Sequence, residues 1–503
     1  MSNDAPRHAP IRRAVSRRTL LSGSLAAAAS ETTGQPAGRK PEWMPSFGAA
    51  PLAVRQQGGW LVGRFRTAAG VSYEARQRLL GHSATAVAVD ARPMEVFLFS
   101  GQSNAGGSPI VEERPDSHSP FVSDPWFPQH LLTTNHWTGT YADKPVAGSC
   151  VTDLSPARDH PRYGTLPQTT FLLTLEALNR AEGKLGPGYA ARTDWWGSQP
   201  LDVFLKGGVQ FANTLASARL LAQQAATYGR LSRIGALVFI HGENRGSHTR
   251  AGYAAALARH FDTLREALPG QGTTAALPIL FTQINQGTTW PRPSGTELAQ
   301  LDVHSAGGAP NWLCGPMYQL PLAVEIRNGR SSAIHQNIPG KMMLGEMLAV
   351  AYRTIVRDGS FTPLRPLRVG LQGETLTLEL AVPARSRLAL DADWLTGRPS
   401  GHAGFIVEAG RENVPVSAIR IEGTSRVALQ LGKPVPDGPV TLRYALDPQP
   451  VDLSQAAAGD ACFAPSTGLL MAETDIPSPF AEHGFAVPKR IRHYCVRFSM
   501  QAR

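Results

Sequence analysis

The sequence predicts an α/β domain built on a parallel sheet, followed by an antiparallel β-sandwich. Between Glu95 and about Gly359, short apolar runs that suit buried strands alternate with longer segments of helical periodicity. That order of elements favours a parallel sheet with helices on both faces. After Pro363 the pattern changes to short alternating strands separated by Gly, Pro and Asp turns, which predicts a β-sandwich of about 140 residues.

The expected elements follow in chain order. Short strand-like runs before residue 93 predict a small β lead-in. The strands expected in the parallel sheet are residues 96–99, 203–205, 236–240 and 278–281, with helices around 212–224, 251–268 and 340–356. The strands expected in the sandwich are residues 367–371, 375–380, 387–390, 427–431 and 440–444. The resulting divisions are a signal segment (1–30), a linker with the lead-in (31–92), the α/β domain (93–360) and the sandwich (361–503).

Composition limits the class of protein. A chain of 503 residues with 42% hydrophobic and 17% charged residues can bury a large core. The formal charge is +10, but Lys and Arg are mostly scattered, and the sequence has neither a long basic block nor a zinc-finger spacing. We therefore expect a generally basic surface and no nucleic-acid partner. The sequence does not specify an oligomeric state.

The amino terminus predicts export. Residues 16–21 read Ser-Arg-Arg-Thr-Leu-Leu and precede a modestly apolar segment, residues 21–29, with small residues suited to cleavage. This pattern resembles the bacterial twin-arginine signal, which predicts a periplasmic or secreted protein. The apolar segment is too short to span a bilayer, and no other run of about 18 apolar residues occurs, so no integral membrane span is expected.

Four cysteines fit an oxidising compartment. They are Cys150, Cys314, Cys462 and Cys495, and their even number permits two disulfides. None lies in a Cys-x-x-Cys spacing. Cys462 and Cys495 flank the final segment and are the favoured pair, with free structural thiols as the alternative.

One polar turn carries a candidate nucleophile. The apolar run 96–99 ends in Gly101-Gln102-Ser103-Asn104, where the glycine lets the chain turn sharply. Ser103 would then project from the carboxyl end of a buried strand, where open α/β sheets place their chemistry. On this segment alone, an ordinary polar turn explains the residues equally well.

Three later segments support the nucleophile. Gly207 and Gly208 join an expected strand to a helix and can present a backbone N–H to an oxyanion. A second strand, residues 236–240, ends in the polar cluster His241-Gly242-Glu243-Asn244. His335 lies in an expected loop just before a helix and could act as a base.

These segments together resemble the SGNH hydrolases, and among them the sialate O-acetylesterase-like and carbohydrate esterase family 6-like proteins. The resemblance covers roughly residues 95–355 and rests on order and spacing as much as on any one motif. Residues 101–107 resemble the family's nucleophile block, Gly207 and Gly208 its glycine block, and residues 240–244 its Gln-Gly-Glu block, with His241 in the place of glutamine. His335 matches the closing histidine block. The resemblance implies a flavodoxin-like three-layer α/β/α fold, and the β-rich carboxyl region resembles an accessory domain of some members.

The chain departs from the family at two positions. Many members carry an aspartate three residues before the histidine, where this sequence has Ser332, which cannot stabilise an imidazolium by charge. Glu243 is the expected substitute, and a Ser103–His335 dyad is the alternative. His241 is expected to donate an N–H to the oxyanion, although it could compete as a base.

The resemblance implies a serine esterase that removes acetyl or other short acyl groups from a carbohydrate or polysaccharide. Ser103 would attack, His335 would accept the proton, and the N–H groups of Ser103 and Gly208 with His241 would hold the oxyanion. Gln102, Asn104 and Asn244 are expected to bind substrate. Neither a metal nor an organic cofactor is expected. The alternatives are a carbohydrate O-acyltransferase that uses the same serine, and a catalytically weak carbohydrate-binding protein.

Overall fold

The structure is a computed structural model, and its described part begins after the expected signal segment. It describes residues 94–106, 166–182, 188–227, 231–268, 276–285, 295–307, 310–395, 401–436, 438–482 and 484–503, and the backbone of shorter strands between residues 51 and 156. All of these belong to the compact unit Trp43–Arg503. The expected signal segment, its linker and Cys150 lie outside the described residues.

A seven-stranded sheet forms the centre of the α/β region, with the order β11-β10-β9-β5-β8-β6-β7. Its strands are β5 (Met94–Gly101), β6 (Leu131–Trp137), β7 (Ser155–Pro156), β8 (Tyr189–Trp195), β9 (Ser232–Ile240), β10 (Ile279–Phe281) and β11 (Asn311–Leu313). Every pairing in this sheet is parallel except that of β6 with β7. The parallel sheet expected from the sequence is therefore confirmed.

The strand order places a crevice at β5. The chain leaves β5, builds β6 and β8 on one side of it, and then crosses to β9 on the other side. In open α/β sheets, such a reversal of strand order separates the loops at the carboxyl ends of the strands, and ligands bind there. Ser103 comes directly after β5 and therefore lies at this position.

One expected strand is wrong. Residues 203–205 are not a strand but belong to a 3₁₀ helix, η4 (Leu201–Val203), and the turn after it. Pro200 precedes this helix, and Asp202 within it is exposed. The apolar run 203–205 is therefore too short to form a buried strand. The strand of the sheet in this part of the chain is β8, whose centre contains Arg192, Thr193 and Asp194. These buried polar residues interrupt the apolar pattern by which strands are recognised.

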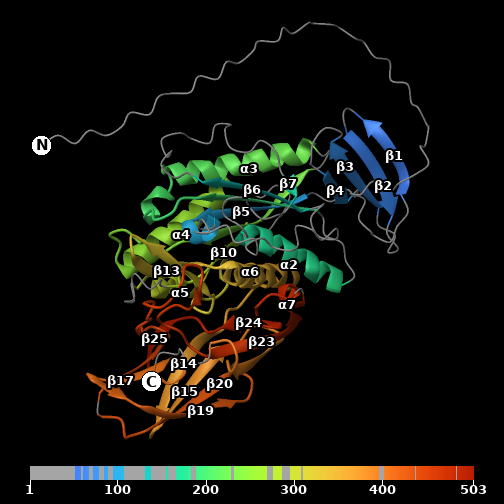
Figure 1. Cartoon of the computed structure of the whole chain (residues 1–503). Helices are drawn as coiled ribbons and strands as arrows, with labels where there is room; N and C mark the ends of the chain where they lie inside the picture. Colours follow the sequence, from blue (N-terminus) through green and yellow to red (C-terminus); the bar gives the residue numbers. More distant parts are fainter. Residues whose placement is uncertain are drawn as a thin grey trace, which may run out of the picture. The chain divides into compact units, whose positions relative to one another are not determined.

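Helices cover both faces of the sheet. The helices α2 (Pro167–Ala181) and α6 (Ile338–Asp358) pack on one face. The helices α3 (Val209–Thr227), α4 (Arg250–Ala267) and α5 (Thr296–Ser305) pack on the other. Figure 1 shows α3 on one side of β5 and α2 with α6 on the other.

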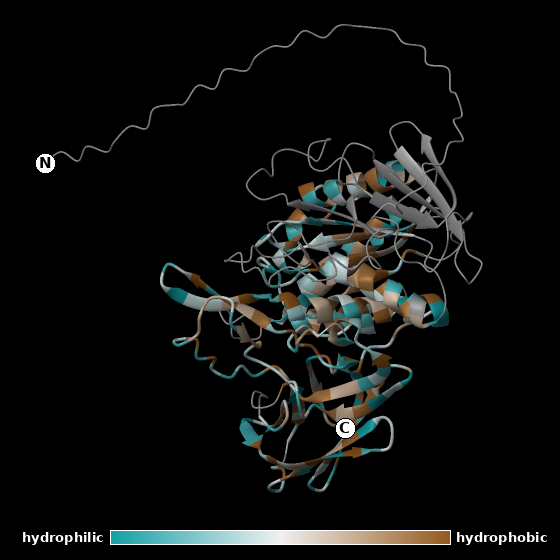
Figure 2. Cartoon of the chain, turned by 45° about the vertical axis from the view of Figure 1, so that its right-hand side comes forward, coloured by the Kyte–Doolittle hydropathy of each residue, from teal (hydrophilic) through white to brown (hydrophobic). Residues whose placement is uncertain are grey.

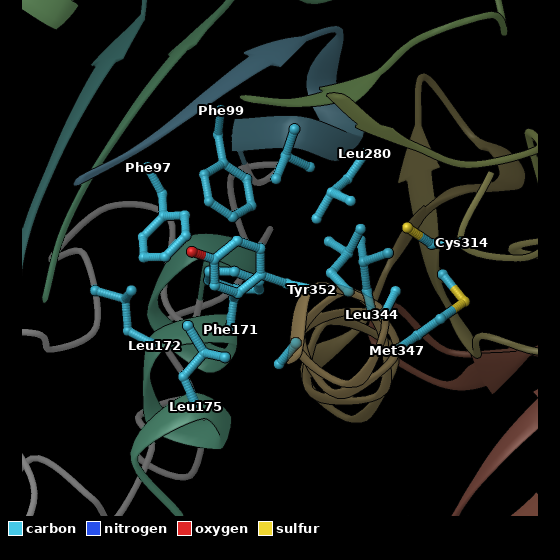
Figure 3. Close-up of a cluster of buried hydrophobic side chains, with 14 of the residues drawn as sticks. Phe97, Phe99, Phe171, Leu172, Leu175, Leu280, Cys314, Leu344, Met347 and Tyr352 are labelled. Atoms are coloured by element: carbon cyan, nitrogen blue, oxygen red, sulfur yellow. The ribbon is translucent and has the colours of Figure 1, made fainter. Parts of the chain in front are cut away.

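Side chains of β5 alternate between the two apolar cores. Phe97 and Phe99 join the core beneath α2 and α6, where the ring of Phe97 makes edge contacts with Phe171 and Tyr352 at 4.9 and 5.0 Å between centroids. Figure 3 shows these side chains converging between the two helices. Val96 and Leu98 join the core on the opposite face. A strand apolar on both faces is expected at the centre of such a sheet.

The carboxyl region is antiparallel. One sheet has the order β14 (Arg365–Gln372), β15 (Thr375–Ala381), β20 (Arg426–Leu431), β19 (Val416–Glu422), and a second has the order β18 (Glu412–Val414), β17 (Phe405–Ala409), β21 (Val440–Tyr444), β25 (Phe498–Gln501). A three-stranded sheet has the order β16 (Ser386–Leu390), β23 (Leu470–Pro477), β24 (Arg490–Tyr494), and α7 (Pro479–Glu482) follows β23. Residues of all three sheets share one apolar core. Figure 2 shows hydrophobic and hydrophilic residues interleaved along these strands, as a sheet with one buried face requires.

Two further sheets complete the described part. The strands β1 (Pro51–Gln57), β2 (Trp60–Arg66), β3 (Ser72–Arg78) and β4 (Ala84–Ala88) form an antiparallel sheet in sequence order. The hairpin of β12 (Leu322–Arg327) and β13 (Arg330–Gln336) is extended by β22 (Ala461–Cys462) from the carboxyl region. The sequence predicted that His335 lies in a loop, but residues up to Gln336 form a strand.

Cys462 and Cys495 are not joined by a disulfide bond, in contrast to the favoured pairing. Cys462 lies on β22 in a small core beneath the β12–β13 hairpin, whereas Cys495 lies in the core of the carboxyl region. Within the described ranges, no helix combines the length and hydrophobicity needed to cross a bilayer.

Candidate active site

The backbone at the end of β5 presents Ser103. Gly101 has φ +142°, and a Cβ added there would lie 1.9 Å from the carbonyl oxygen of Ile240 on β9. Only glycine fits this close approach of two strands. The N–H of Gln102 donates to the same Ile240 oxygen at 2.9 Å, and α1 (Ser103–Gly106) begins at the next residue. Ser103 thus stands at the carboxyl edge of the sheet on a rigid turn.

His335 lies beside this serine. Its Nε2 is 2.8 Å from Ser103 Oγ, although the two residues are far apart in sequence. The histidine comes from β13, three residues before α6 begins at Ile338. The sequence-predicted pair of nucleophile and base is thus brought within hydrogen-bonding distance, the geometry that proton transfer requires.

The carboxylate that contacts His335 is Glu325, not Glu243. Glu325 Oε1 is hydrogen-bonded to His335 Nδ1, and the side chain of Glu325 is only 4% exposed. With Nδ1 directed at a carboxylate, the neutral imidazole carries its proton on Nδ1, and Nε2 is left to accept a proton from Ser103. The sequence analysis did not include Glu325 among the site residues.

A β-bulge turns His335 toward Glu325. Glu325 pairs with Ser332 and Val324 with Ala333, but the next pair is Leu322 with Gln336. One residue of β12 therefore faces both Ile334 and His335 on β13. An extra residue in one strand breaks the alternation of side chains and redirects the side chain that follows, so His335 reaches the face that Glu325 occupies.

Glu243 contacts the nucleophile turn instead of the histidine. Its Oε1 accepts a hydrogen bond from Asn104 Nδ2 at 2.8 Å. Burial raises the pKa of Glu243, and the hydrogen bond from Asn104 partly opposes this rise. Asn104 Nδ2 also lies 3.5 Å from the carbonyl oxygen of Ile334. Asn104, which was expected to bind substrate, thus links the nucleophile turn to the strand of His335.

Two expected oxyanion donors are otherwise engaged. The N–H of Gly208 donates to the carbonyl of Leu205 at 2.8 Å, and a Cβ at Gly208 would lie 2.2 Å from the oxygen of Val203. Gly208 is therefore a turn residue. His241 is 1% exposed, with Nε2 3.2 Å from the oxygen of Gln199 and Nδ1 2.9 Å from the hydroxyl of Tyr253.

The surroundings of His241 fix its protonation state. A carbonyl oxygen only accepts, so Nε2 carries the proton and Nδ1 accepts from Tyr253. Burial lowers the pKa of His241 to about 3, and the imidazole is neutral across the physiological range. Its two ring nitrogens both have partners, which leaves His241 unable to serve as an oxyanion donor or as a competing base.

Gly197 supplies an N–H that the sequence analysis missed. It follows β8, and a Cβ built on it would lie 3.6 Å from the Cβ of Ser103. Among the described residues, no acceptor is found for the Gly197 N–H. The N–H of Ser103 opens α1 and has no intrahelical partner. Among the described residues, the N–H of Gly197 and the N–H of Ser103 itself are therefore both left without an acceptor.

Gln102 and Asn244, which were expected to bind substrate, and His241, which was expected to donate to the oxyanion, hold the loop of Gly197 in place. Gln102 Nε2 donates to the oxygen of Gln199 at 2.6 Å, and His241 Nε2 donates to the same oxygen. Asn244 Nδ2 donates to the oxygen of Ser198 at 2.8 Å. Ser198 has φ +62°, a strained value for a residue with a side chain, so these bonds keep the loop in a conformation it would not adopt alone.

Two tryptophans, Trp195 and Trp196, directly precede Gly197 in the chain. A Cβ at Gly106 would lie 1.9 Å from the ring of Trp195, so that ring packs directly on α1 and is buried. Trp196, the next residue, is half-buried and precedes Gly197. Across the described ranges, no group of three or more His, Cys, Asp or Glu side chains is arranged to hold a metal ion.

Two solved structures are similar to part of the chain at low sequence identity. No protein-family model and no curated protein sequence matches the chain. A solved structure of a protein from Arabidopsis thaliana is similar over 52% of this chain and 99% of its own, with 16% identity and a TM-score of 0.36. The crystal structure of NanS is similar over 54% of this chain and 99% of its own, with 12% identity and a TM-score of 0.38. These scores are too low for either match to assign a function to this chain.

Proposed function

We propose that this protein is an exported serine esterase of the SGNH-hydrolase type that removes acetyl or other short acyl groups from carbohydrate. One observation carries the proposal: His335 links Ser103 Oγ, at 2.8 Å, to the buried carboxylate of Glu325. A hydroxyl, an imidazole and a carboxylate in this order are the parts of a serine nucleophile with its general base. Glu325 supplies the charge that Ser332 lacks, so the main reason to expect a catalytically weak binding protein disappears.

The reaction proceeds in two steps, acylation of Ser103 and hydrolysis of the acyl-serine. His335 Nε2 takes the proton from Ser103 Oγ as that oxygen bonds to the ester carbonyl carbon, and the carbonyl electrons move to the oxygen. When the tetrahedral intermediate collapses, the bond to the sugar oxygen breaks and His335 returns the proton to that oxygen. Water then attacks the acyl-serine by the same steps and releases the carboxylic acid. Glu325 stabilises the imidazolium in both steps.

The N–H groups of Ser103 and Gly197 form the oxyanion hole in this mechanism. Gly197 is close to the serine, since a Cβ built on it would lie 3.6 Å from the Cβ of Ser103, and in this mechanism both N–H groups stabilise the ester carbonyl oxygen as it becomes negatively charged. Loss of one such donor typically costs about 2.7 to 4 kcal/mol of transition-state stabilisation. The bonds from Gln102, His241 and Asn244 to the Gly197 loop act indirectly, by keeping that donor in position.

The substrate class rests on the resemblance and on export. Acetylated polysaccharides would be met by a protein outside the cytoplasm, and the signal-like amino terminus predicts such a location. Trp196, half-buried and next to Gly197 in the chain, is the aromatic residue that we propose for stacking on a sugar ring.

A fluorogenic acetyl ester tests the proposal. The mature full-length protein should hydrolyse it, and Ser103→Ala should abolish turnover. Ser100→Ala is the matched control, because Ser100 is a buried serine at the end of β5 whose hydroxyl accepts a hydrogen bond from Thr214. Equal turnover by the wild type and Ser103→Ala would exclude a serine esterase. Acyl transfer to an added sugar, in place of acid release, would indicate the acyltransferase.

A further inference from the structure

The β12–β13 hairpin carries both His335 and Glu325, and the carboxyl region extends it by a strand. Leu322 pairs with Cys462 and Ala323 with Ala461. The pairing continues one residue further, because Val324 N–H donates to the oxygen of Asp460 and Gly459 N–H donates to the oxygen of Val324, both at 2.8 Å. The residue that precedes Glu325 is thus held at both main-chain groups by the carboxyl region.

Residues of the carboxyl region also cover one face of the β12–β13 hairpin. Leu322, Val324 and Ala333 form a small apolar cluster with Cys462, and Leu453 and Ala456 pack against it. This cluster is separate from the cores on the two faces of the main sheet. Without the carboxyl-region residues, the buried face of the hairpin would lose part of its apolar cover.

A second connection reaches the residue that precedes His335. Arg497, between β24 and β25, donates from its two terminal nitrogens to the carbonyl oxygens of Ile284 at 2.7 Å and Asn285 at 3.0 Å. Asn285 in turn donates from Nδ2 to the oxygen of Ile334 at 2.9 Å. Ile334 is one of the two residues of the β-bulge that redirects His335.

Arg497 joins the loop after β10 to the carboxyl region. Its side chain is 0% exposed, and it also donates to the oxygens of Ala445 at 2.9 Å and Ser466 at 2.8 Å. A buried cation is costly unless polar groups surround it. The guanidinium of Arg497 thus donates to four carbonyl oxygens, two from the loop after β10 and two from the carboxyl region. Because the guanidinium is rigid, it holds these two segments together.

We propose that the carboxyl region is a positioning element of the active site, with Arg497 and Asn285 as positioning residues for the Glu325–His335 pair. This inference rests on the proposed esterase function. Each member of the pair is held at the residue before it, Val324 by the 459–462 segment and Ile334 by Asn285 and Arg497. The region would then be required for catalysis itself, beyond any role in binding polysaccharide.

Two substitutions in the full-length protein test the inference. Asn285→Leu removes the donor to Ile334, and Arg497→Met removes the donors to the loop of Asn285. We expect kcat on a small acetyl ester to fall roughly 10- to 100-fold with KM nearly unchanged, because a small displacement of the base disturbs proton transfer more than binding. The pH–rate profile should shift as well, since the contact of His335 with Glu325 changes.

Matched controls separate positioning from loss of stability. Arg492→Met also removes a partly buried arginine of the carboxyl region, whose partners Asp393 and Asp391 lie in that region. Asn179→Leu removes a buried amide that donates to Tyr189. Both controls should keep the wild-type kcat and pH profile even where thermal unfolding shows comparable destabilisation. If Arg497→Met does not fold, Asn285→Leu decides the question alone.

A double-mutant cycle completes the test. In a Glu325→Gln background, Asn285→Leu should cause little further loss, because the arrangement it protects is already disrupted. Wild-type kinetics in Asn285→Leu, or an equal loss with and without Glu325, would overturn the positioning role. Ser103→Ala decides the esterase proposal separately, so failure of one proposal is distinguishable from failure of the other.

Discussion

Glu325 lies directly across the β12–β13 hairpin from Ser332, the position three residues before His335. Residues paired in this way have their Cβ atoms about 4.5 to 5.5 Å apart on the same face of the sheet. In the resembling family, an aspartate often occupies the position of Ser332. The carboxylate of this chain thus comes from the neighbouring strand and still reaches Nδ1 of the histidine.

Glu325→Gln should reduce kcat far more than Glu243→Gln. Glutamine cannot stabilise the imidazolium and can favour the wrong tautomer, for which a loss of roughly 10⁴-fold is known in serine proteases. Glu243 contacts Asn104 rather than the histidine, so its substitution should cost much less. Steady-state kinetics on an acetyl ester measure both variants. A larger loss in Glu243→Gln would restore the interpretation drawn from the sequence.

An acid introduced at position 332 should restore part of the activity that is lost when Glu325 is removed. In a Glu325→Ala variant, Ser332→Asp places an acid on the same face as the missing glutamate. We expect the double variant to exceed Glu325→Ala in kcat by about 10-fold or more, but not to reach the wild type, because the shorter side chain starts from another strand. Ser331→Asp is the control, since adjacent strand residues point to opposite faces. Equal rescue by both acids would indicate a general charge effect.

The sequence predicted Ser103 and His335 because each follows a recognisable local pattern. Glu325 was not predicted as a site residue, because cross-strand pairing and a β-bulge cannot be read from spacing along the chain. Strand β8 escaped for a related reason. Arg192 is buried in it with its Nε 2.5 Å from Ser217 Oγ of α3, a contact made across the fold that cannot be read from the local sequence.

Asn244→Leu should lower kcat with a smaller effect on KM. The substitution removes the donor to the carbonyl of Ser198, whose positive φ then loses one of its restraints. The N–H of Gly197 would become less well placed, and an oxyanion donor acts mainly in the transition state. We expect a loss of roughly 10-fold, less than deletion of a donor itself. A rise in KM with unchanged kcat would instead indicate that Asn244 binds substrate.

His260→Leu should make the protein more resistant to acid. His260 is buried against Phe239, and burial lowers its pKa to about 3. Between the ordinary value near 6.5 and about 3, the unfolded state binds a proton that the folded state does not, so stability falls as the pH falls. Leucine removes this titration, and Nδ1 of His260 has no hydrogen bond to lose in the described part of the chain. Denaturant unfolding at pH 7 and pH 4 measures the difference. An unchanged pH dependence would contradict the expected low pKa.

For Glu346 we expect the opposite dependence of folding stability on pH. It is a buried residue of α6 that accepts a hydrogen bond from Ser478 of the carboxyl region, and burial raises its pKa to about 8. Between the ordinary value near 4.5 and about 8, the folded state keeps a proton that the unfolded state has released, so stability falls as the pH rises. Glu346→Gln should remove this loss, on the order of a few kcal/mol at pH 8, because glutamine stays neutral and retains an acceptor for Ser478. Unfolding free energies of the wild type and the variant at pH 5 and pH 8 test this directly. Because α6 begins three residues after His335, the same measurements, paired with kcat, would show whether loosening this contact also disturbs the base.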